Sequence, residues 1–313
     1  MDRGLIEQST IANNVNIWRQ KMPRAELDGA SIFYRETGTG LPFVFCHEFA
    51  GSMESWSAQV SFFSRRYKIV TFNARGYPPS SVPDDVAEYS QDHQVETLLQ
   101  LLDHLEISKA YICGLSMGAH TALNFSLAYP ERCLGIVAAG AGTGSADPVS
   151  FAIESNQRAD VLEAKGMLGM ESYLTGSTRI RFKQKDRQGW EEFKRLFERH
   201  SPQGSARTLR GFQAKRPSLP SLYDKFAQSK IPTLILCGDE DDPCLQPSLL
   251  LKQAIPRSGL AFLPQTGHAC NIEEPGLFNS LVAEFLVMVE SGQWTHRPES
   301  SGDSWAMPSK QDL

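Results

Sequence analysis

The feature that most constrains this chain is the pentapeptide Gly-Leu-Ser-Met-Gly at residues 114–118. It follows an apolar, strand-like run at 110–113 and precedes an Ala-rich stretch of helical character from Ala119. The chain must turn from strand to helix within about one turn, and glycine on either side of the serine permits a close backbone approach that a Cβ would obstruct. The turn holds the Ser116 hydroxyl at the strand end, above the positive N-terminus of the helix, where it is a candidate nucleophile.

Two later strand ends supply the residue types that a nucleophilic serine requires. An apolar run leads into the acidic segment 238–242, and a second short strand leads into His268. A serine hydroxyl becomes reactive when an imidazole takes its proton, and a carboxylate holds that imidazole in the correct tautomer. His268 is therefore the candidate base, and Asp239, Asp241 and Asp242 compete for the role of the acid. The order Ser, Asp, His differs from the orders in chymotrypsin and subtilisin.

Over residues 25–293 the chain resembles the α/β-hydrolase superfamily. The motifs that carry the resemblance are His47 and Phe49 after a strand at 43–45, Asn-Ala-Arg-Gly at 73–76, the pentapeptide at 114–118, Gly-Asp-Glu-Asp at 238–241, Thr-Gly-His at 266–268 and Glu-Glu-Pro at 273–275. The resemblance implies an α/β fold: a mostly parallel sheet flanked by helices, with a helical cap insertion. It also implies that Asp241 is the acid and that the backbone N–H groups of Phe49 and Met117 form an oxyanion hole.

Glu48 departs from the family pattern, which usually has glycine after the loop histidine. A carboxylate beside an oxyanion hole would oppose the negative charge that develops there, unless it points away or is protonated. One interpretation is that Glu48 accepts backbone N–H bonds and stiffens the loop. The other makes it an acid or a contact to a substrate hydroxyl, with its pKa raised by burial. Trp56 and Tyr77 are further candidates for substrate binding, with core packing as the alternative.

Strand and helix signals alternate as in a parallel sheet that is covered on both faces. Helices are expected at 55–66, 90–106, 117–129, 246–255 and 274–289, and an antiparallel hairpin at 24–38. Residues 147–228 break this rhythm and predict a helical cap after the sixth strand, between core segments 1–146 and 229–293. A polar tail, 294–313, follows. The basic run at 179–185 could grip an acidic substrate, although a solvated helix face is the preferred interpretation.

Charge and composition exclude several classes of function. The formal net charge of −5 offers no electrostatic basis for a nucleic-acid partner. No apolar run approaches the roughly 18 residues of a membrane span, and the polar N-terminus lacks the apolar core of a secretory signal. The six cysteines lack metal-like spacing, so we expect reduced, packed thiols and a cytoplasmic location.

The sequence therefore predicts a serine hydrolase that cleaves an ester, thioester or lactone-like small molecule through Ser116, His268 and Asp241. An acyl-enzyme forms on the serine, and no metal or organic cofactor is required. Three alternatives stay open. The first is an epoxide hydrolase or a polyketide-tailoring hydrolase of secondary metabolism, although epoxide hydrolases normally carry Asp at the position of Ser116. The others are hydrolysis of a carbon–carbon bond by the same triad and a non-catalytic ligand receptor on the same fold.

Overall fold

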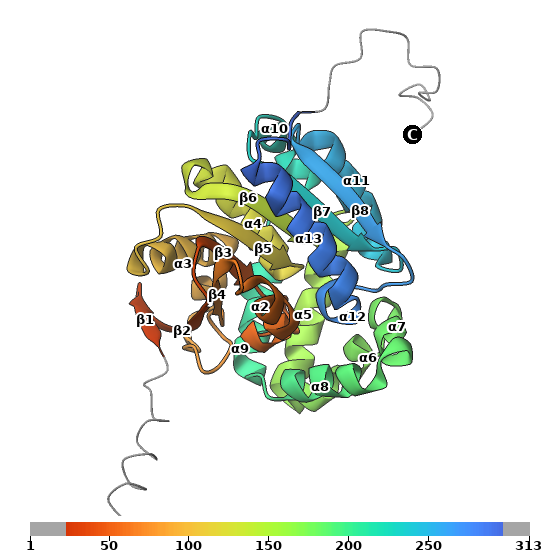
Figure 1. Ribbon diagram of the computed structural model, residues 1–313. Coiled ribbons are helices and arrows are strands. Elements are labelled where there is room, and N and C mark those ends of the chain that lie inside the picture. The colour runs from red at the N-terminus through yellow and green to blue at the C-terminus, as the bar shows by residue number, and fades with distance from the viewer. Residues whose placement is uncertain (1–22, 297–313) are drawn as a thin grey trace, which may run out of the picture.

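The computed structural model describes residues 23–296 and centres on a sheet of eight strands (Figure 1). The strands are β1 (Arg24–Leu27), β2 (Ala30–Thr37), β3 (Leu41–Cys46), β4 (Tyr67–Phe72), β5 (Ala110–Leu115), β6 (Cys133–Ala139), β7 (Thr233–Gly238) and β8 (Ser258–Leu263). They lie in the order β1-β2-β4-β3-β5-β6-β7-β8. Strands β1, β2 and β4 pair antiparallel, and all later neighbours pair parallel. The predicted hairpin and mostly parallel sheet are confirmed.

Helices cover both faces of the sheet, because successive apolar side chains along a strand point to opposite faces and both sets must be buried. In β3, Val44 and Cys46 pack in the core on one face, whereas Phe43 and Phe45 pack in the core on the other. A strand that is buried on both faces reads as an unbroken apolar run, as β3 does. Figure 1 shows α2 and α13 on the near face of the sheet. Residues of α3, α4 and α11 build the core on the opposite face.

The flanking helices confirm the predicted positions with small shifts at their ends. They are η1 (Met53–Trp56), α2 (Ser57–Phe63), η2 (Val86–Tyr89), α3 (Gln91–His104), α4 (Met117–Ala128), η3 (Pro130–Arg132), α11 (Asp242–Ala254), α12 (Cys270–Glu273) and α13 (Pro275–Glu290). Helix α11 begins at Asp242, ahead of the predicted start at residue 246. The reason is local, because Pro243 occupies the first turn of α11. Backbone N–H groups in that turn have no partner within the helix, so proline, which lacks the N–H, is tolerated there.

A run of helices between β6 and β7 confirms the predicted helical insertion. It comprises α5 (Pro148–Lys165), η4 (Met167–Met170), α6 (Glu171–Leu174), α7 (Ser177–Lys185), α8 (Arg187–Glu198), α9 (Pro202–Thr208), η5 (Leu209–Gln213), η6 (Pro220–Leu222) and α10 (Tyr223–Ala227). Apolar side chains of α8, among them Trp190 and Phe197, share a buried cluster with Phe49 and Met117 from the sheet side. The insertion therefore packs over the loops that leave the strands at their carboxyl ends. At its far end, Phe226 of α10 packs into the sheet core.

The terminal segments bear on three sequence predictions. The polar N-terminus lies outside the described residues, as does the tail beyond residue 296. At the start of that tail, the Trp294 indole donates to the Arg257 carbonyl at 2.8 Å and packs edge-on against Phe285. None of the helices within residues 23–296 combines the length and the apolar character that crossing a membrane requires.

Candidate active site

Ser116 lies in a strained turn between β5 and α4. Its φ of 53° is in the left-handed region, which costs a residue with a Cβ about 1–3 kcal/mol. Sterics require glycine on both sides of Ser116. A Cβ on Gly114 would lie 2.1 Å from the Gly118 carbonyl oxygen. A Cβ on Gly118 would lie 2.0 Å from the Cys46 carbonyl oxygen of β3. The predicted strand-to-helix turn is confirmed, and it aims Ser116 into a cavity.

His268 and Asp241 meet at the ends of β8 and β7. The Nδ1–H of His268 donates to Oδ2 of Asp241 at 2.7 Å, and both side chains are buried. Asp239 faces another way, accepting the Thr266 N–H at 3.1 Å, and Asp242 is exposed at the start of α11. Of the three competing aspartates, Asp241 is thus the one that the structure brings to the imidazole.

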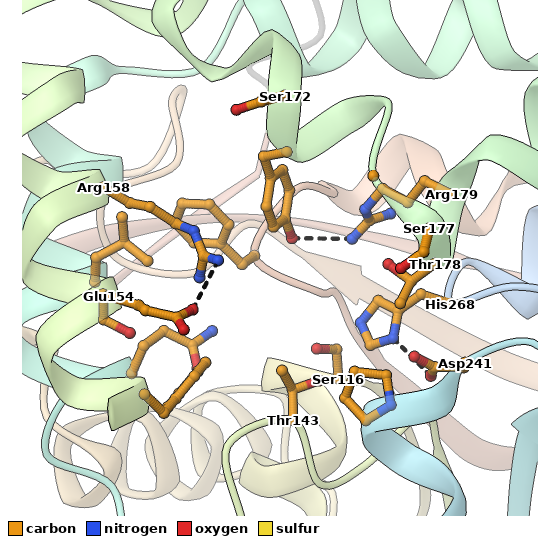
Figure 2. A pocket seen from close by; sticks show the side chains of 18 of the residues that line it. Ser116, Thr143, Glu154, Arg158, Ser172, Ser177, Thr178, Arg179, Asp241 and His268 are labelled. Carbon is orange, nitrogen blue, oxygen red and sulfur yellow. Dashed lines mark hydrogen bonds and ion pairs between the residues drawn. The ribbon is translucent and has the colours of Figure 1, made fainter. Parts of the chain in front are cut away.

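Ser116 shares a cavity of about 300 Å³ with this pair (Figure 2). The Ser116 N–H donates to the Ala139 carbonyl at the end of β6, at 2.8 Å. The next residue, Gly140, is so close to the pair that a Cβ there would lie 3.4 Å from both Asp241 Oδ2 and His268 Cε1. The end of β6 therefore joins the serine turn to the His268–Asp241 pair. Within residues 23–296, the Ser116 hydroxyl has no hydrogen bond to His268.

The loop after β3 brings Phe49 to the cavity wall, and two aromatic residues support this loop from behind. The Tyr77 hydroxyl donates to the Phe49 carbonyl at 2.9 Å. The Nε2 of His47 accepts the Ala74 N–H at 3.0 Å, so its Nδ1 carries the proton that it donates to the Glu48 carbonyl at 2.7 Å. Burial lowers the pKa of His47 to about 4, which agrees with a neutral ring. The backbone N–H groups of Phe49 and Met117 donate to no other residue in the described part of the chain.

Glu48 forms a buried ion pair that neither sequence interpretation anticipated. Its carboxylate accepts two hydrogen bonds from Arg179 of α7, at 3.3 and 2.5 Å, and both side chains are almost completely buried. Arg179 also donates to the Tyr173 hydroxyl at 2.9 Å. Burial alone would raise the pKa of Glu48, but the guanidinium outweighs it and the pKa lies below its usual range. The expectation of a raised pKa is wrong, because the partner lies 131 residues away in sequence.

Trp56 and Tyr77 are corrections to the sequence analysis, since neither side chain lines the cavity. Trp56 is buried on the sheet side, where its ring centre lies 4.9 Å from Phe45 and 6.2 Å from Phe278. Tyr77 is fully buried, and it supports the site through its hydrogen bond to Phe49 and its ring contact with His47. For both residues the alternative of core packing is the one that the structure supports.

Arg179 departs from the preferred interpretation of the basic run as a solvated helix face, because its side chain is buried, whereas Arg181 and Lys185 are partly exposed. Besides Arg179, Arg181 donates to Glu240 at 2.6 and 2.8 Å, and Lys185 pairs with Glu274. These contacts attach α7 to the loops after β3 and β7 and to the turn between α12 and α13. The His268 N–H also donates to the carbonyl of Thr178 at 2.7 Å, so α7 borders the cavity directly.

Several cavity-lining residues escaped the sequence analysis. They lie on the insertion and on the loop after β6: Thr143, Phe151, Glu154, Ser155, Arg158, Gln213 and Arg216. A partial signal exists on α5, where residues 151, 154, 155 and 158 follow helical spacing and share one face. Three of these four residues are polar, as on a solvated helix face, so sequence alone did not separate them from such a surface.

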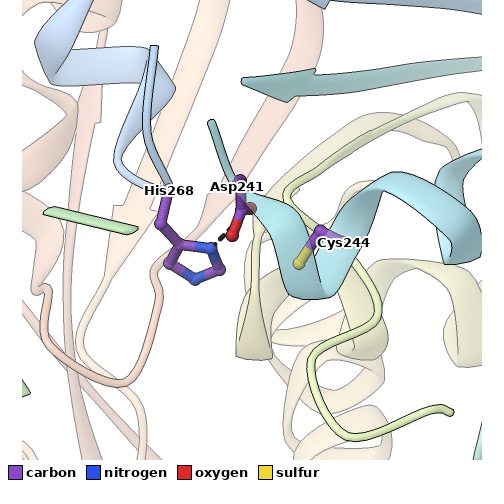
Figure 3. Close-up of side chains that lie close together, drawn as sticks. All are labelled: Asp241, Cys244 and His268. Carbon is purple, nitrogen blue, oxygen red and sulfur yellow. Dashed lines mark hydrogen bonds and ion pairs between the residues drawn. The ribbon is translucent and has the colours of Figure 1, made fainter. Parts of the chain in front are cut away.

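Asp241, Cys244 and His268 form a cluster whose ligand-type atoms lie within 4.8 Å of one another (Figure 3). The Cys244 thiol lies 3.3 Å from the Gly140 carbonyl and 3.3 Å from the Thr143 hydroxyl. Burial raises the pKa of Cys244 well above its usual value, whereas a cysteine binds metal as a thiolate. Because His268 Nδ1 already donates to Asp241, the cluster fits a hydrogen-bonded support for the acid better than a metal site.

Comparisons with known proteins agree with this fold. A family model described as "alpha/beta hydrolase fold" matches residues 42–275. A putative 2-succinyl-6-hydroxy-2,4-cyclohexadiene-1-carboxylate synthase of Bacillus subtilis is 25% identical, over 78% of this chain and 89% of the relative. The 3-oxoadipate enol-lactonase 2 of Acinetobacter baylyi is 26% identical, over 76% of this chain and 86% of the relative. The crystal structure of the enol-lactonase from Burkholderia xenovorans LB400 has a TM-score of 0.75 at 20% identity, covering 85% of this chain and 100% of that chain, and shows the fold alone.

Proposed function

This chain belongs to the α/β-hydrolase family and is an enzyme of that family, and from this premise we propose that it is a serine hydrolase of small ester, thioester or lactone-like molecules. The observation that carries the proposal is the buried His268–Asp241 hydrogen bond of 2.7 Å beside a cavity that Ser116 shares. That combination supplies a nucleophile, a base and a group that orients the base.

In the proposed reaction, the Ser116 hydroxyl attacks the carbonyl carbon of the substrate and His268 Nε2 takes the hydroxyl proton. Asp241 stabilises the imidazolium and holds Nδ1 protonated, which leaves Nε2 free to act. The negative charge that develops on the carbonyl oxygen is held by the N–H groups of Phe49 and Met117. One such donor typically contributes about 2.7–4 kcal/mol.

His268 then returns its proton to the leaving oxygen or sulfur as the bond from that atom to the carbonyl carbon breaks, which leaves an acyl-enzyme on Ser116. Water next cleaves the acyl-enzyme, and His268 takes a proton from the attacking water as the new C–O bond forms. The Ser116–acyl bond breaks, the serine regains a proton and the acid product departs. Proton transfer requires the Ser116 oxygen to come within about 2.6–3.2 Å of Nε2, a contact that enzymes often tighten only when substrate binds.

We extend the proposal to the domain organisation, with a core of residues 1–146 and 229–293 and a cap of residues 147–228. Support comes from the contacts of α7, which joins the loop after β3 through Arg179 and the His268 backbone through Thr178. A cap in this position excludes water from the proposed oxyanion hole and selects which small molecules enter.

The proposal is tested with Ser116→Ala and a fluorophosphonate probe. We expect the parent enzyme to be labelled at Ser116 and to hydrolyse short-chain esters or lactones. Ser116→Ala, with an unchanged circular dichroism spectrum, should lose both labelling and at least about 10³-fold in kcat. Ser280→Ala is the matched control, because Ser280 lies on the exposed face of α13, away from the cavity.

Three results would favour the other hydrolase reactions or a receptor. Opening of epoxides without ester cleavage would indicate an epoxide hydrolase, and cleavage of a carbon–carbon bond in a diketone would indicate a carbon–carbon bond hydrolase. Tight binding of small ligands with no probe labelling would indicate a receptor. Ester hydrolysis by Ser116→Ala at the parent rate would refute the nucleophile.

A further inference from the structure

Three arginines line the cavity, and two of them already have a carboxylate partner. Arg158 donates to Glu154 at 3.0 Å, one helical turn earlier on α5, at the side of the cavity opposite His268 (Figure 2). Arg179 is paired with Glu48. Arg216, after η5, has no carboxylate at ion-pair distance within residues 23–296. The cavity wall therefore holds one positive charge that no side chain of the described chain neutralises.

The Arg216 guanidinium is held in place by neutral groups. One nitrogen, Nη2, donates to the Thr143 carbonyl at 2.5 Å, and Nη1 donates to the side-chain oxygen of Gln213. The guanidinium carbon lies 5.0 Å from the centre of the Phe151 ring and 5.8 Å from that of Phe212. These contacts orient the cation without supplying an opposite charge.

Arg216 remains charged at neutral pH although its surroundings disfavour the charge. Burial lowers the pKa of Arg216 to about 10, and the two groups that oppose this shift are Cys244 and Tyr173. Burial raises the pKa of each of these two groups, so both are neutral at pH 7. A partly buried cation without a counter-charge is stabilised by an anion that enters the cavity.

Two neutral donors line the same cavity as this cation. Gln213 is buried and uses its side-chain oxygen for Arg216, so its NH₂ group is the part left to donate into the cavity. Ser155 is fully buried on the cavity-facing side of α5, and its hydroxyl has no partner in the described part of the chain. A hydroxyl and an amide that share a cavity with a guanidinium complement a group with several acceptor oxygens and one negative charge, and a carboxylate is such a group.

We infer that Arg216, with Gln213 and Ser155, binds a free carboxylate of the substrate, distinct from the acyl group that Ser116 attacks. The inference rests on the proposed function and narrows its substrates to half-esters, lactones or thioesters of dicarboxylic or oxo acids. A short chain of contacts links the two ends of such a substrate. Arg216 bonds to Thr143, Thr143 contacts Cys244, and Cys244 contacts Gly140 beside His268.

The test compares two ester series of equal chain length. The charged series is the monoethyl esters of glutaric, adipic and pimelic acid, and the neutral series is ethyl pentanoate, hexanoate and heptanoate. We expect the parent enzyme to prefer the charged series in kcat/KM. Arg216→Gln should lower kcat/KM about 100-fold for the best charged ester, mostly through KM, and less than about threefold for its neutral counterpart. Arg216→Lys should fall between them, because it keeps the charge but loses the planar fork.

Arg158→Gln is the matched control, since it removes a cavity arginine that already has a carboxylate partner. A preference that Arg158→Gln abolishes and Arg216→Gln preserves would overturn the assignment. Equal losses for charged and neutral esters in a folded Arg216→Gln would show that Arg216 only braces the loop at Thr143. A parent enzyme that prefers the neutral series would also overturn it, whether or not any variant folds.

A binding measurement separates failure of this inference from failure of the proposed function. Ser116→Ala is titrated with glutarate, adipate and pimelate by calorimetry, with hexanoate and inorganic phosphate as comparison ligands. Saturable binding of a dicarboxylate that Arg216→Gln abolishes supports the subsite even if no ester is hydrolysed. Absence of dicarboxylate binding in an enzyme that hydrolyses neutral esters rejects the subsite and leaves the serine hydrolase standing.

Discussion

Removing the negative charge of Glu48 should destabilise this protein far more than removing an equivalent charge at its surface. Glu48→Gln leaves the guanidinium of Arg179 buried with only neutral partners, the new amide and the Tyr173 hydroxyl. Breaking one side of a buried ion pair typically costs about 3–5 kcal/mol. We expect Glu48→Gln to lower the free energy of unfolding by about 3 kcal/mol, at the low end of this range, because the new amide and the Tyr173 hydroxyl still accept hydrogen bonds from Arg179. The measurement is urea denaturation at pH 7, followed by fluorescence.

The matched control is Glu240→Gln, which breaks the pair with Arg181. About a third of each side chain of that pair is exposed, so the urea midpoint should hardly move. The double variant Glu48→Leu, Arg179→Met should recover at least about 1 kcal/mol relative to Glu48→Gln, since it leaves no buried charge. If Glu48→Gln and Glu240→Gln unfold at the same urea concentration, the reasoning about the buried pair is wrong.

The Glu48 variant also has a predictable pH dependence and a predictable effect on catalysis. The folded-state pKa of Glu48 is lowered, so the pair contributes its stability above the unfolded pKa of about 4.3 and loses it as the pH falls further. The parent and Glu48→Gln should therefore converge in stability at acid pH. Because Glu48 precedes Phe49, loosening the loop should lower kcat by up to about 10²-fold, the loss on removal of one oxyanion donor.

Three further predictions follow from the loops around Ser116. Gly118→Ala should prevent folding, because its Cβ would lie 2.0 Å from a backbone oxygen of β3. In the control Gly276→Ala the added Cβ meets no atom within 4 Å, so this variant should unfold at no lower temperature than the parent. Expression levels and thermal melts check both variants. His47 should make the parent less stable as the pH falls from about 6.5 to about 4, by roughly 3 kcal/mol at 1.36 kcal/mol per pKa unit, because the folded state resists protonation. His47→Gln should make that part of the urea-midpoint profile less steep without flattening it, because burial also lowers the pKa of His120 and of His200; an unchanged slope would contradict this. Tyr77→Phe should lower the free energy of unfolding in urea by about 1–3 kcal/mol, because it leaves the buried Phe49 carbonyl unpaired. The same variant should lower kcat more than it raises KM, and an equal change in the two constants would contradict a positioning role for Tyr77.

Local patterns predicted the architecture because each depends on atoms that are close in sequence. The glycines at 114 and 118 permit the turn at Ser116, and alternation of apolar residues in β3 assigns side chains to two covered faces. Ordered motifs at strand ends also placed Asp241 and His268 on neighbouring loops, since adjacent parallel strands bring their carboxyl ends to one edge.

Tertiary structure alone decided which charges meet across the cavity. Sequence offered Glu48 a backbone partner or a substrate, but docking of α7 gave it Arg179. Trp56 is of a residue type that often lines pockets, but it lies in the core. Arg216 is of a type common at protein surfaces, but it lines the cavity. Backbone conformation follows from short-range sterics, which a sequence carries locally. Partners of a buried charge depend on how distant segments pack, and no spacing along the chain encodes that.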